Sequence, residues 1–257
     1  MAEVKQISSL NSKLVDELND ALQSALHPVV KSTILLEKAE NLSQDQRQEV
    51  AKANLNCRKL IDMMNYRCEL THVADGSDRM EATRCDLHGL MTDIDRQFSH
   101  RAETKKLFFA VSFAQYQTAH NVPKHVETDE LKVRKILSIL LGYAMEKTEK
   151  GRIGLHATRK SCSGESANIA FELAYTGKEP RDELLSALFG NEEKENEVVD
   201  VKYGLTLARR YLGMLDGEFA LEYRAGGITA LTMQFPFRKA ASEITTSGND
   251  EKKAGAA

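Results

Sequence analysis

A long helical pattern of apolar residues in the N-terminal part of the chain places the strongest constraint on its fold. Between residues 7 and 70, apolar side chains recur at steps of three and four, the spacing of one face of an α-helix. Pro28 lacks an amide hydrogen and its ring clashes with the preceding turn, so we expect a kink there. Residues 40–43 predict a turn, and Ser43 followed by Gln46 is a capping-box pattern that predicts the start of a second helix. The stripe of the first helix consists of Leu10, Leu14, Leu18, Ala21, Leu22, Ala25, Leu26, Val29 and Val30.

Two long helices joined by a short connection form an antiparallel hairpin. One hairpin cannot cover so wide an apolar stripe, whereas two hairpins can pack as a four-helix bundle. We therefore expect residues 9–71 to be a homodimerisation domain that follows a flexible N-terminus at residues 1–8. The alternative is that the hairpin packs on the C-terminal part of its own chain.

Helix and strand patterns alternate in the rest of the chain. Residues 72–83 are polar, contain a glycine and predict a linker. Helices interleaved with antiparallel strands predict an α/β sandwich over residues 84–238, so the expected fold class is α+β. Beyond it, residues 239–257 are poor in apolar side chains and predict a disordered tail. The helical patterns lie at 87–102, 130–147, 181–189 and 204–215, the strand patterns at 107–113, 153–159, 168–174, 219–223 and 228–235, and a charged loop at 191–197.

Composition excludes several classes of function. The net charge of −3 gives no global basic field, so we expect no nucleic-acid partner. The longest strongly apolar run, 136–145, is far shorter than the roughly 20 residues of a membrane helix, and the N-terminus lacks the apolar core of a signal peptide. These features predict a cytoplasmic protein that does not enter the membrane.

Four cysteines occur, and none forms a Cys-x-x-Cys pair. We find no histidine at metal-ligand spacing to them, so reduced thiols are expected and neither a metal nor a cofactor is predicted. Walker, nucleophile-elbow and His-Glu-x-x-His motifs are also missing from the sequence. The cysteines are Cys57, Cys68, Cys85 and Cys162.

The order of the predicted elements resembles the core of sensor histidine kinases, a dimerisation and phosphotransfer hairpin followed by a Bergerat-type ATPase domain. The resemblance covers nearly the whole chain, from about residue 14 to residue 237. Its motifs are specific as a set and weak singly. They read TDELKVRKIL at 128–137, LLGYA at 140–144, YTG at 175–177, GLTLA at 204–208, LDG at 215–217 and MQFPF at 233–237.

The residues that handle magnesium and adenine in that family are replaced here. Tyr143 stands where the family has a magnesium-holding Asn, and Ile139 stands at the other family Asn. A phenol is a poor ligand for an ion that prefers compact oxygen donors and water. In the Asp-x-Gly-x-Gly loop, Tyr175 replaces the Asp that binds the adenine amino group. Gly177 is kept, and Glu179 replaces the second Gly and adds negative charge.

The phosphate-binding Gly-x-Gly-Leu-Gly loop of the family is also altered. Its glycines let backbone amides approach the phosphates, and here Lys202, Gly204 and Thr206 stand at the three positions. Lys202 could itself meet a phosphate. If each loss in the pocket costs about 1–2 kcal/mol, the affinity for nucleotide falls by several orders of magnitude. The alternative is a pocket redesigned for another small molecule.

The phosphoacceptor histidine of the family is missing as well. Alignment of the apolar positions places Asp20 at its site, and alignment on Pro28 places Gln23 there. We prefer the first alignment because it preserves the apolar face. His27, directly before Pro28, could accept a phosphoryl group from a receiver aspartate, since neutral imidazole is nucleophilic. The alternative is that His27 is a polar residue at a kink without a role in phosphotransfer.

The resemblance and the losses together predict a catalytically inactive, histidine-kinase-like adaptor. Its partners would be a response-regulator receiver domain or a histidine kinase, bound through the helical bundle. The alternatives are a histidine phosphotransferase acting through His27 and a weak ATP-binding enzyme. The partner surface would centre on Asp20, Gln23, Ser24, His27 and Lys31.

Overall fold

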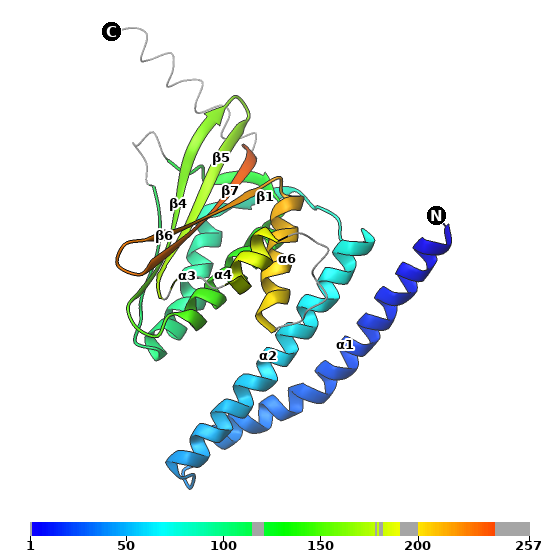
Figure 1. The fold of residues 1–257 in the computed structure, drawn as a ribbon, viewed down its shortest axis with the longest axis vertical. Helices are drawn as coiled ribbons and strands as arrows, with labels where there is room; N and C mark the ends of the chain where they lie inside the picture. The colour runs from blue at the N-terminus through cyan, green and yellow to red at the C-terminus, as the bar shows by residue number, and fades with distance from the viewer. Residues whose placement is uncertain (1, 115–120, 178, 180–181, 191–199, 240–257) are drawn as a thin grey trace. The chain divides into compact units, whose positions relative to one another are not determined.

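A computed structural model describes residues 2–114, 121–177, 179, 182–190 and 200–239 (Figure 1). The chain divides into two compact units. Unit 1 comprises residues 1–79 and 195–207, and unit 2 comprises residues 80–194 and 208–257. The predicted charged loop at 191–197 and the tail beyond residue 239 lie outside the described residues.

Unit 1 is built around a hairpin of two long helices, as the apolar repeat predicts. Helix α1 spans Ala2–Glu37 and helix α2 spans Gln44–Asp75. Helix α1 therefore starts within the segment expected to be a flexible N-terminus, and it continues as one helix through Pro28. Helix α2 continues into the expected linker to Asp75 and is capped by Gly76, whose φ of 74° is the left-handed conformation common after helices.

The turn between the two helices is fixed by side chains that satisfy backbone groups. The Ser43 hydroxyl accepts a hydrogen bond from the amide of Gln46, and the Gln46 side chain accepts one from the amide of Ser43 at 2.9 Å. This confirms the predicted capping box. The guanidinium of Arg47 donates to the carbonyls of Glu37 and Ala39 at 3.0 and 2.8 Å, so it holds the end of α1 against the start of α2.

Unit 2 combines helices with a mixed sheet, which confirms the α+β class. Helix α6 begins in unit 1 and passes into unit 2 at Ala208. Helices α3 and α4 lie on one face of the sheet (Figure 1). The elements are β1 (Thr83–Asp86), α3 (Leu87–Thr104), β2 (Phe108–Phe113), β3 (His125–Thr128), α4 (Glu130–Lys147), β4 (Arg152–Ser163), β5 (Ser166–Thr176), α5 (Asp182–Phe189), α6 (Asp200–Met214), β6 (Glu218–Arg224) and β7 (Ile228–Lys239).

The strands pair in the order β1-β3-β7-β5-β4-β2, and β6 pairs with β7. The pair β2–β4 is parallel and the other pairs are antiparallel. The sequence pattern predicts neither β1 nor β3. Each has four residues and contributes one buried apolar side chain, Cys85 and Val126, so neither carries a periodic signal.

The interior of unit 2 is apolar and closely packed. Phe171 on β5 and Phe235 on β7 are fully buried, with their rings edge to face and the centroids 5.6 Å apart. Helix α4 brings Ile136, Leu137 and Leu140 into the same core. This packing holds α4 against the sheet and so positions the residues at the ends of α4 and of the strands.

In the part of the chain that the structure describes, none of the helices is both long enough and apolar enough to cross a bilayer.

Candidate functional site

A pocket of about 750 Å³ lies in unit 2 where the C-terminal end of α4 meets the end of β5. The structure brings four residues of the predicted nucleotide pocket to this place: Tyr143, Tyr175, Gly177 and Glu179. They come from separate parts of the sequence and meet at one pocket. The complete lining is Tyr143, Glu146, Lys147, Glu149, Lys150, Tyr175, Thr176, Gly177, Glu179 and Tyr223.

Two buried tyrosines form the floor of the pocket. Tyr143 and Tyr175 are 7% and 3% exposed, and their rings meet edge to face with the centroids 6.4 Å apart. The ammonium of Lys147 lies 5.3 Å from the centroid of Tyr143, a cation–π contact. Burial raises the pKa of the Tyr175 phenol above its ordinary value, so the group stays neutral at physiological pH. A neutral phenol supplies no carboxylate for an adenine amino group.

The charges around the pocket give no excess of positive charge. Its lining contributes three carboxylates, Glu146, Glu149 and Glu179, against two ammonium groups, Lys147 and Lys150. A polyphosphate needs cationic groups or unpaired backbone amides around it. The charge of this lining is therefore poorly matched to a nucleoside triphosphate.

Hydrogen bonds to backbone groups hold the rim of the pocket. The hydroxyl of Thr176 donates to the carbonyl of Lys150 and accepts from the amide of Arg152, both at 3.0 Å. The amide of Gly177 donates to the carbonyl of Gly227 at 2.9 Å. These bonds fix the end of β5 between two turns, so the tyrosines sit in a preformed wall.

The remaining residues of the predicted pocket are not among its lining. Ile139 is 7% exposed on α4, one turn before Tyr143, and its side chain offers no metal ligand. Thr206 is 6% exposed on α6. Gly204 is also on α6, as is Lys202, whose side chain lies outside the described residues.

Helix α6 takes up the segment that the resemblance assigns to the phosphate loop. The sequence predicts a helix from residue 204, but α6 starts at Asp200. In an α-helix the amides beyond the first four bond to carbonyls four residues back, so from Gly204 onward they are engaged inside the helix. The helix starts earlier than expected because one glycine among residues that carry side chains costs only about 1 kcal/mol in a helix and does not break it.

The predicted partner surface lies on α1. Asp20, Ser24, His27 and Lys31 are exposed, and their steps of four, three and four residues place them on one face of the helix. Gln23 is separated from them, because its side-chain amide donates to Oδ1 of Asn65 on α2 at 2.7 Å. Four of the five predicted residues thus share an accessible face.

The two helices of the hairpin meet through polar side chains. Ser12, Asn19, Thr33 and Asn54 are each at most 8% exposed. Oδ1 of Asn19 has no hydrogen-bond partner among the described residues, although the Asn19 side-chain amide lies 3.3 Å from Oδ1 of Asn65. Several large apolar side chains of the hairpin are instead exposed. The exposed apolar residues are Leu14, Leu18, Val29, Leu35, Leu36, Leu55 and Leu60.

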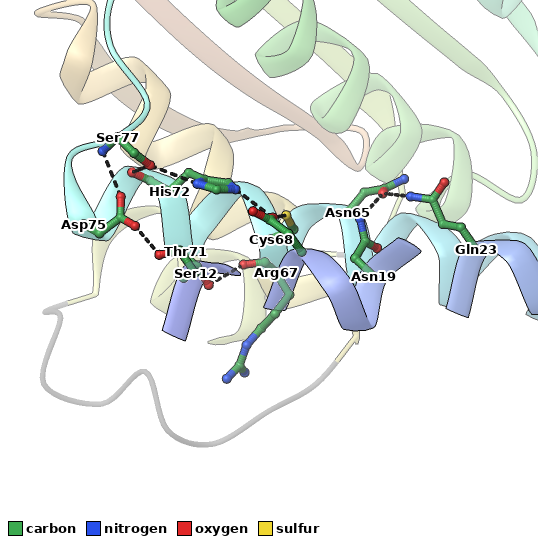
Figure 2. A network of polar contacts seen from close by, with 11 residues as sticks. Ser12, Asn19, Gln23, Asn65, Arg67, Cys68, Thr71, His72, Asp75 and Ser77 are labelled. Atoms are coloured by element: carbon green, nitrogen blue, oxygen red, sulfur yellow. Dashed lines mark hydrogen bonds and ion pairs between the residues drawn. The ribbon is translucent and has the colours of Figure 1, made fainter. Parts of the chain in front are cut away.

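Figure 2 shows a cluster near the open end of the hairpin that the sequence interpretation missed. Oδ1 of Asp16 on α1 lies 2.8 Å from Sγ of Cys68 and 2.9 Å from Nε2 of His72, both on α2. The prediction that no histidine lies at metal-ligand spacing to a cysteine was wrong, because Cys68 and His72 are four residues apart on one helix. That spacing was a usable signal, whereas Asp16, some 50 residues away, gave none.

Comparison with known proteins shows what this chain is similar to. No protein-family model matches it. Probable histidine kinase 6 of Oryza sativa subsp. japonica is 29% identical over 143 residues, which cover 56% of this chain and 14% of that protein. The autoinducer 2 sensor kinase/phosphatase LuxQ of Vibrio cholerae serotype O1 is 22% identical over 240 residues, which cover 91% of this chain and 27% of that protein. The chain spans well under half of the length of either relative.

Among solved structures, full-length ShkA in complex with AMPPNP superimposes with a TM-score of 0.64 at 21% identity. The match covers 89% of this chain and 46% of that protein. The similarity to sensor histidine kinases that the motifs predict is therefore confirmed in both sequence and fold. The chain is thus similar to sensor histidine kinases, with a helical hairpin followed by an ATPase-type fold.

Proposed function

We propose that this chain is a catalytically inactive, histidine-kinase-like regulator that binds another two-component protein through its hairpin. The observation that carries the proposal is the buried pair Tyr143 and Tyr175, which fills the two positions where the family holds magnesium and adenine. Two aromatic rings packed edge to face leave no carboxylate or amide oxygen at these positions. The extension of α6 over the former phosphate loop removes a further set of amide donors.

The outward-facing leucines support a homodimer through residues 9–71. Leu14 and Leu18 on α1 are 64% and 53% exposed, and Leu55 on α2 is 54% exposed. Exposed apolar surface of this extent on a helical hairpin favours a partner that covers it. A second copy of the hairpin supplies the same stripe and closes a four-helix bundle, as expected from the sequence.

The exposed face of α1 supports docking of a receiver domain or of a histidine kinase. Asp20 brings a carboxylate to the place where a phosphohistidine would form, next to Ser24, His27 and Lys31. A carboxylate resembles a phosphoryl group in charge but cannot be transferred. We infer that this face holds a partner without exchanging phosphate.

Loss of catalysis is tested by nucleotide binding and phosphotransfer. Calorimetry with Mg–ATP is expected to show no binding at micromolar nucleotide, and incubation with a phosphorylated receiver is expected to leave the protein unlabelled. Micromolar binding would contradict the proposal and favour a weak ATP-binding enzyme. Labelling of the wild type that disappears in His27→Ala would instead identify a histidine phosphotransferase.

The dimer is tested by charge substitution on the exposed stripe. The double variant Leu14→Glu/Leu18→Glu is expected to sediment as a folded monomer, because both side chains are exposed in a single chain and charges are costly only when the partner buries them. The matched control is Leu131→Glu, since Leu131 is 76% exposed on α4. Unchanged mass of the double variant at all concentrations would count against the bundle.

Partner docking is tested with purified receiver domains and with kinase hairpins. Asp20→Lys is expected to weaken the complex at least about tenfold, because the loss of one charged contact is worth roughly this factor in affinity. Glu49→Lys is the matched control, because Glu49 is an exposed carboxylate on α2. Mixed dimers with a kinase on co-expression would identify a kinase as the partner, and equal weakening by both variants would show that only the overall charge matters.

A further inference from the structure

We propose that Asp16, Cys68 and His72 form a binding site for a divalent transition-metal ion of the Zn²⁺ type. The site joins α1 to α2 near the open end of the hairpin (Figure 2). It lies wholly within unit 1 and is independent of the proposed adaptor function.

The geometry brings three different donor atoms to one point. Oδ1 of Asp16 is 2.8 Å from Sγ of Cys68 and 2.9 Å from Nε2 of His72, and the three ligand atoms lie within 4.8 Å of one another. The two residues on α2 are four apart, the spacing that presents two ligands on one helical face. All three residues are partly exposed, so their side chains can adjust and a water molecule can complete a tetrahedral site.

The histidine is oriented by a second layer of hydrogen bonds. Nδ1 of His72 lies 2.9 Å from the hydroxyl of Ser77. Ser77 is held in turn by Asp75, whose carboxylate accepts from the Ser77 amide at 2.8 Å and from the hydroxyl of Ser12. Metal-bound histidines usually have their second ring nitrogen engaged in this way, which fixes the other nitrogen as the ligand. Here that other nitrogen is Nε2, which faces Asp16.

The chemistry of the donors selects the metal. A thiolate, an imidazole and a carboxylate suit Zn²⁺ or Co²⁺ and are a poor match for Mg²⁺ or Ca²⁺, which prefer oxygen ligands. In the metal-free cluster the Cys68 thiol donates its hydrogen bond to Oδ1 of Asp16. As the sulfur–metal bond forms, the S–H bond breaks and the proton leaves to solvent.

Occupancy of the site would clamp the hairpin. Asp16 is separated from Cys68 and His72 by more than fifty residues of chain, including the turn between the helices. A metal that binds only the closed hairpin stabilises it by mass action. The level of metal would thus control how firmly the two helices are held together.

The test uses the 257-residue chain, stripped of metal with a chelator and then titrated with Zn²⁺ or Co²⁺. The wild type is expected to bind one ion, and Co²⁺ to give the intense visible bands of a tetrahedral site with a sulfur-to-metal charge-transfer band. Cys68→Ser and His72→Gln are each expected to weaken binding at least about tenfold. Cys57→Ser is the matched control, because Cys57 is also a partly buried cysteine on α2, and it is expected to bind like the wild type.

A second measurement avoids dependence on the folding of the variants. In the wild type, Zn²⁺ is expected to slow alkylation of Cys68, mapped by mass spectrometry, without slowing alkylation of Cys57 or the exposed Cys162. Wild-type affinity in Cys68→Ser, or equal protection of all three thiols, would overturn the proposal. Either result would leave Asp16, Cys68 and His72 as a hydrogen-bonded cluster only.

Discussion

The two parts of this chain bury opposite kinds of side chain. In the hairpin, Asn19 and Asn54 are buried between the helices while Leu14 and Leu35 are 64% and 70% exposed. In the sheet unit, the buried set is dominated by aliphatic and aromatic residues such as Phe171. The sheet unit therefore has a hydrophobic core of its own, whereas the hairpin leaves several large apolar side chains exposed.

This difference indicates which part of the molecule was free to change. A core of packed rings and aliphatic chains holds the sheet unit together, and Tyr143 and Tyr175 are buried with it. The buried polar contacts between the two helices of the hairpin contribute little net free energy to its stability.

The largest effect is expected from truncation of the sheet core. Phe171→Ala should lower the free energy of unfolding by about 3–5 kcal/mol, because it leaves a cavity among buried rings. Leu35→Ala, on the exposed face of α1, should change it by less than about 0.5 kcal/mol when the protein is dilute. Urea unfolding of both variants measures the contrast, and equal losses would mean that the two parts are stabilised alike.

An intermediate effect is expected at the N-cap of α4. Asp129 is 4% exposed and accepts hydrogen bonds from the amides of Glu81 and Lys132, both at 3.1 Å, while the Lys132 ammonium lies 3.2 Å away. Asp129→Ala should cost about 1.5–3 kcal/mol, since it removes charge-assisted hydrogen bonds and leaves a buried ammonium. Asp45→Ala, at an exposed position in the first turn of α2, is the control and should cost far less.

The same carboxyl predicts a pH dependence. Burial alone would raise the pKa of Asp129, but the hydrogen bonds from Glu81 and Lys132 outweigh it and the net pKa is lowered from 3.8. A lowered folded-state pKa stabilises the fold above the unfolded value, and this contribution is lost as the pH falls through the folded value. The stability gap between wild type and Asp129→Asn should therefore shrink below about pH 4. A gap that stays constant to pH 2 would show that ionisation plays no part.

The smallest effect, and one of opposite sign, is expected in the hairpin seam. Asn19→Leu should be neutral or stabilise the hairpin by less than about 1 kcal/mol, because it removes a buried amide whose Oδ1 has no partner among the described residues. Asn65 still accepts a hydrogen bond from Gln23 in this variant. Hydrogen exchange of α1 amides measures the change. Faster exchange would mean that the polar seam is stabilising after all.

Local signals in the sequence predicted the elements that carry their own start and stop residues. Ser43 and Gln46 marked the start of α2, and Asp129 is the N-cap of α4, whose bounds of Glu130–Lys147 match the prediction. Strands β1 and β3 were missed because their pairing is decided by neighbours in the sheet. The early start of α6 was missed because a family motif suggested a loop where the local residues propagate a helix.

The candidate site divides in the same way. The replacement of ligand-binding residues by Tyr143 and Tyr175 could be read from the motifs, but their edge-to-face burial could not. The i, i+4 pair of Cys68 and His72 was available in the sequence and was overlooked. Its third member, Asp16, could be found only after α1 and α2 were paired, since a helix register does not specify which residue of another helix it meets.

The sequence by itself determined the helical hairpin, the α+β class and the loss of the kinase motifs, because periodicity, capping residues and motif spacing act over short stretches of chain. The tertiary structure alone decided which face of the hairpin is polar, which tyrosines meet, and which donors gather around Asp16. These depend on contacts between residues that are distant in sequence, where burial and hydrogen bonding select one arrangement among many that the local pattern allows.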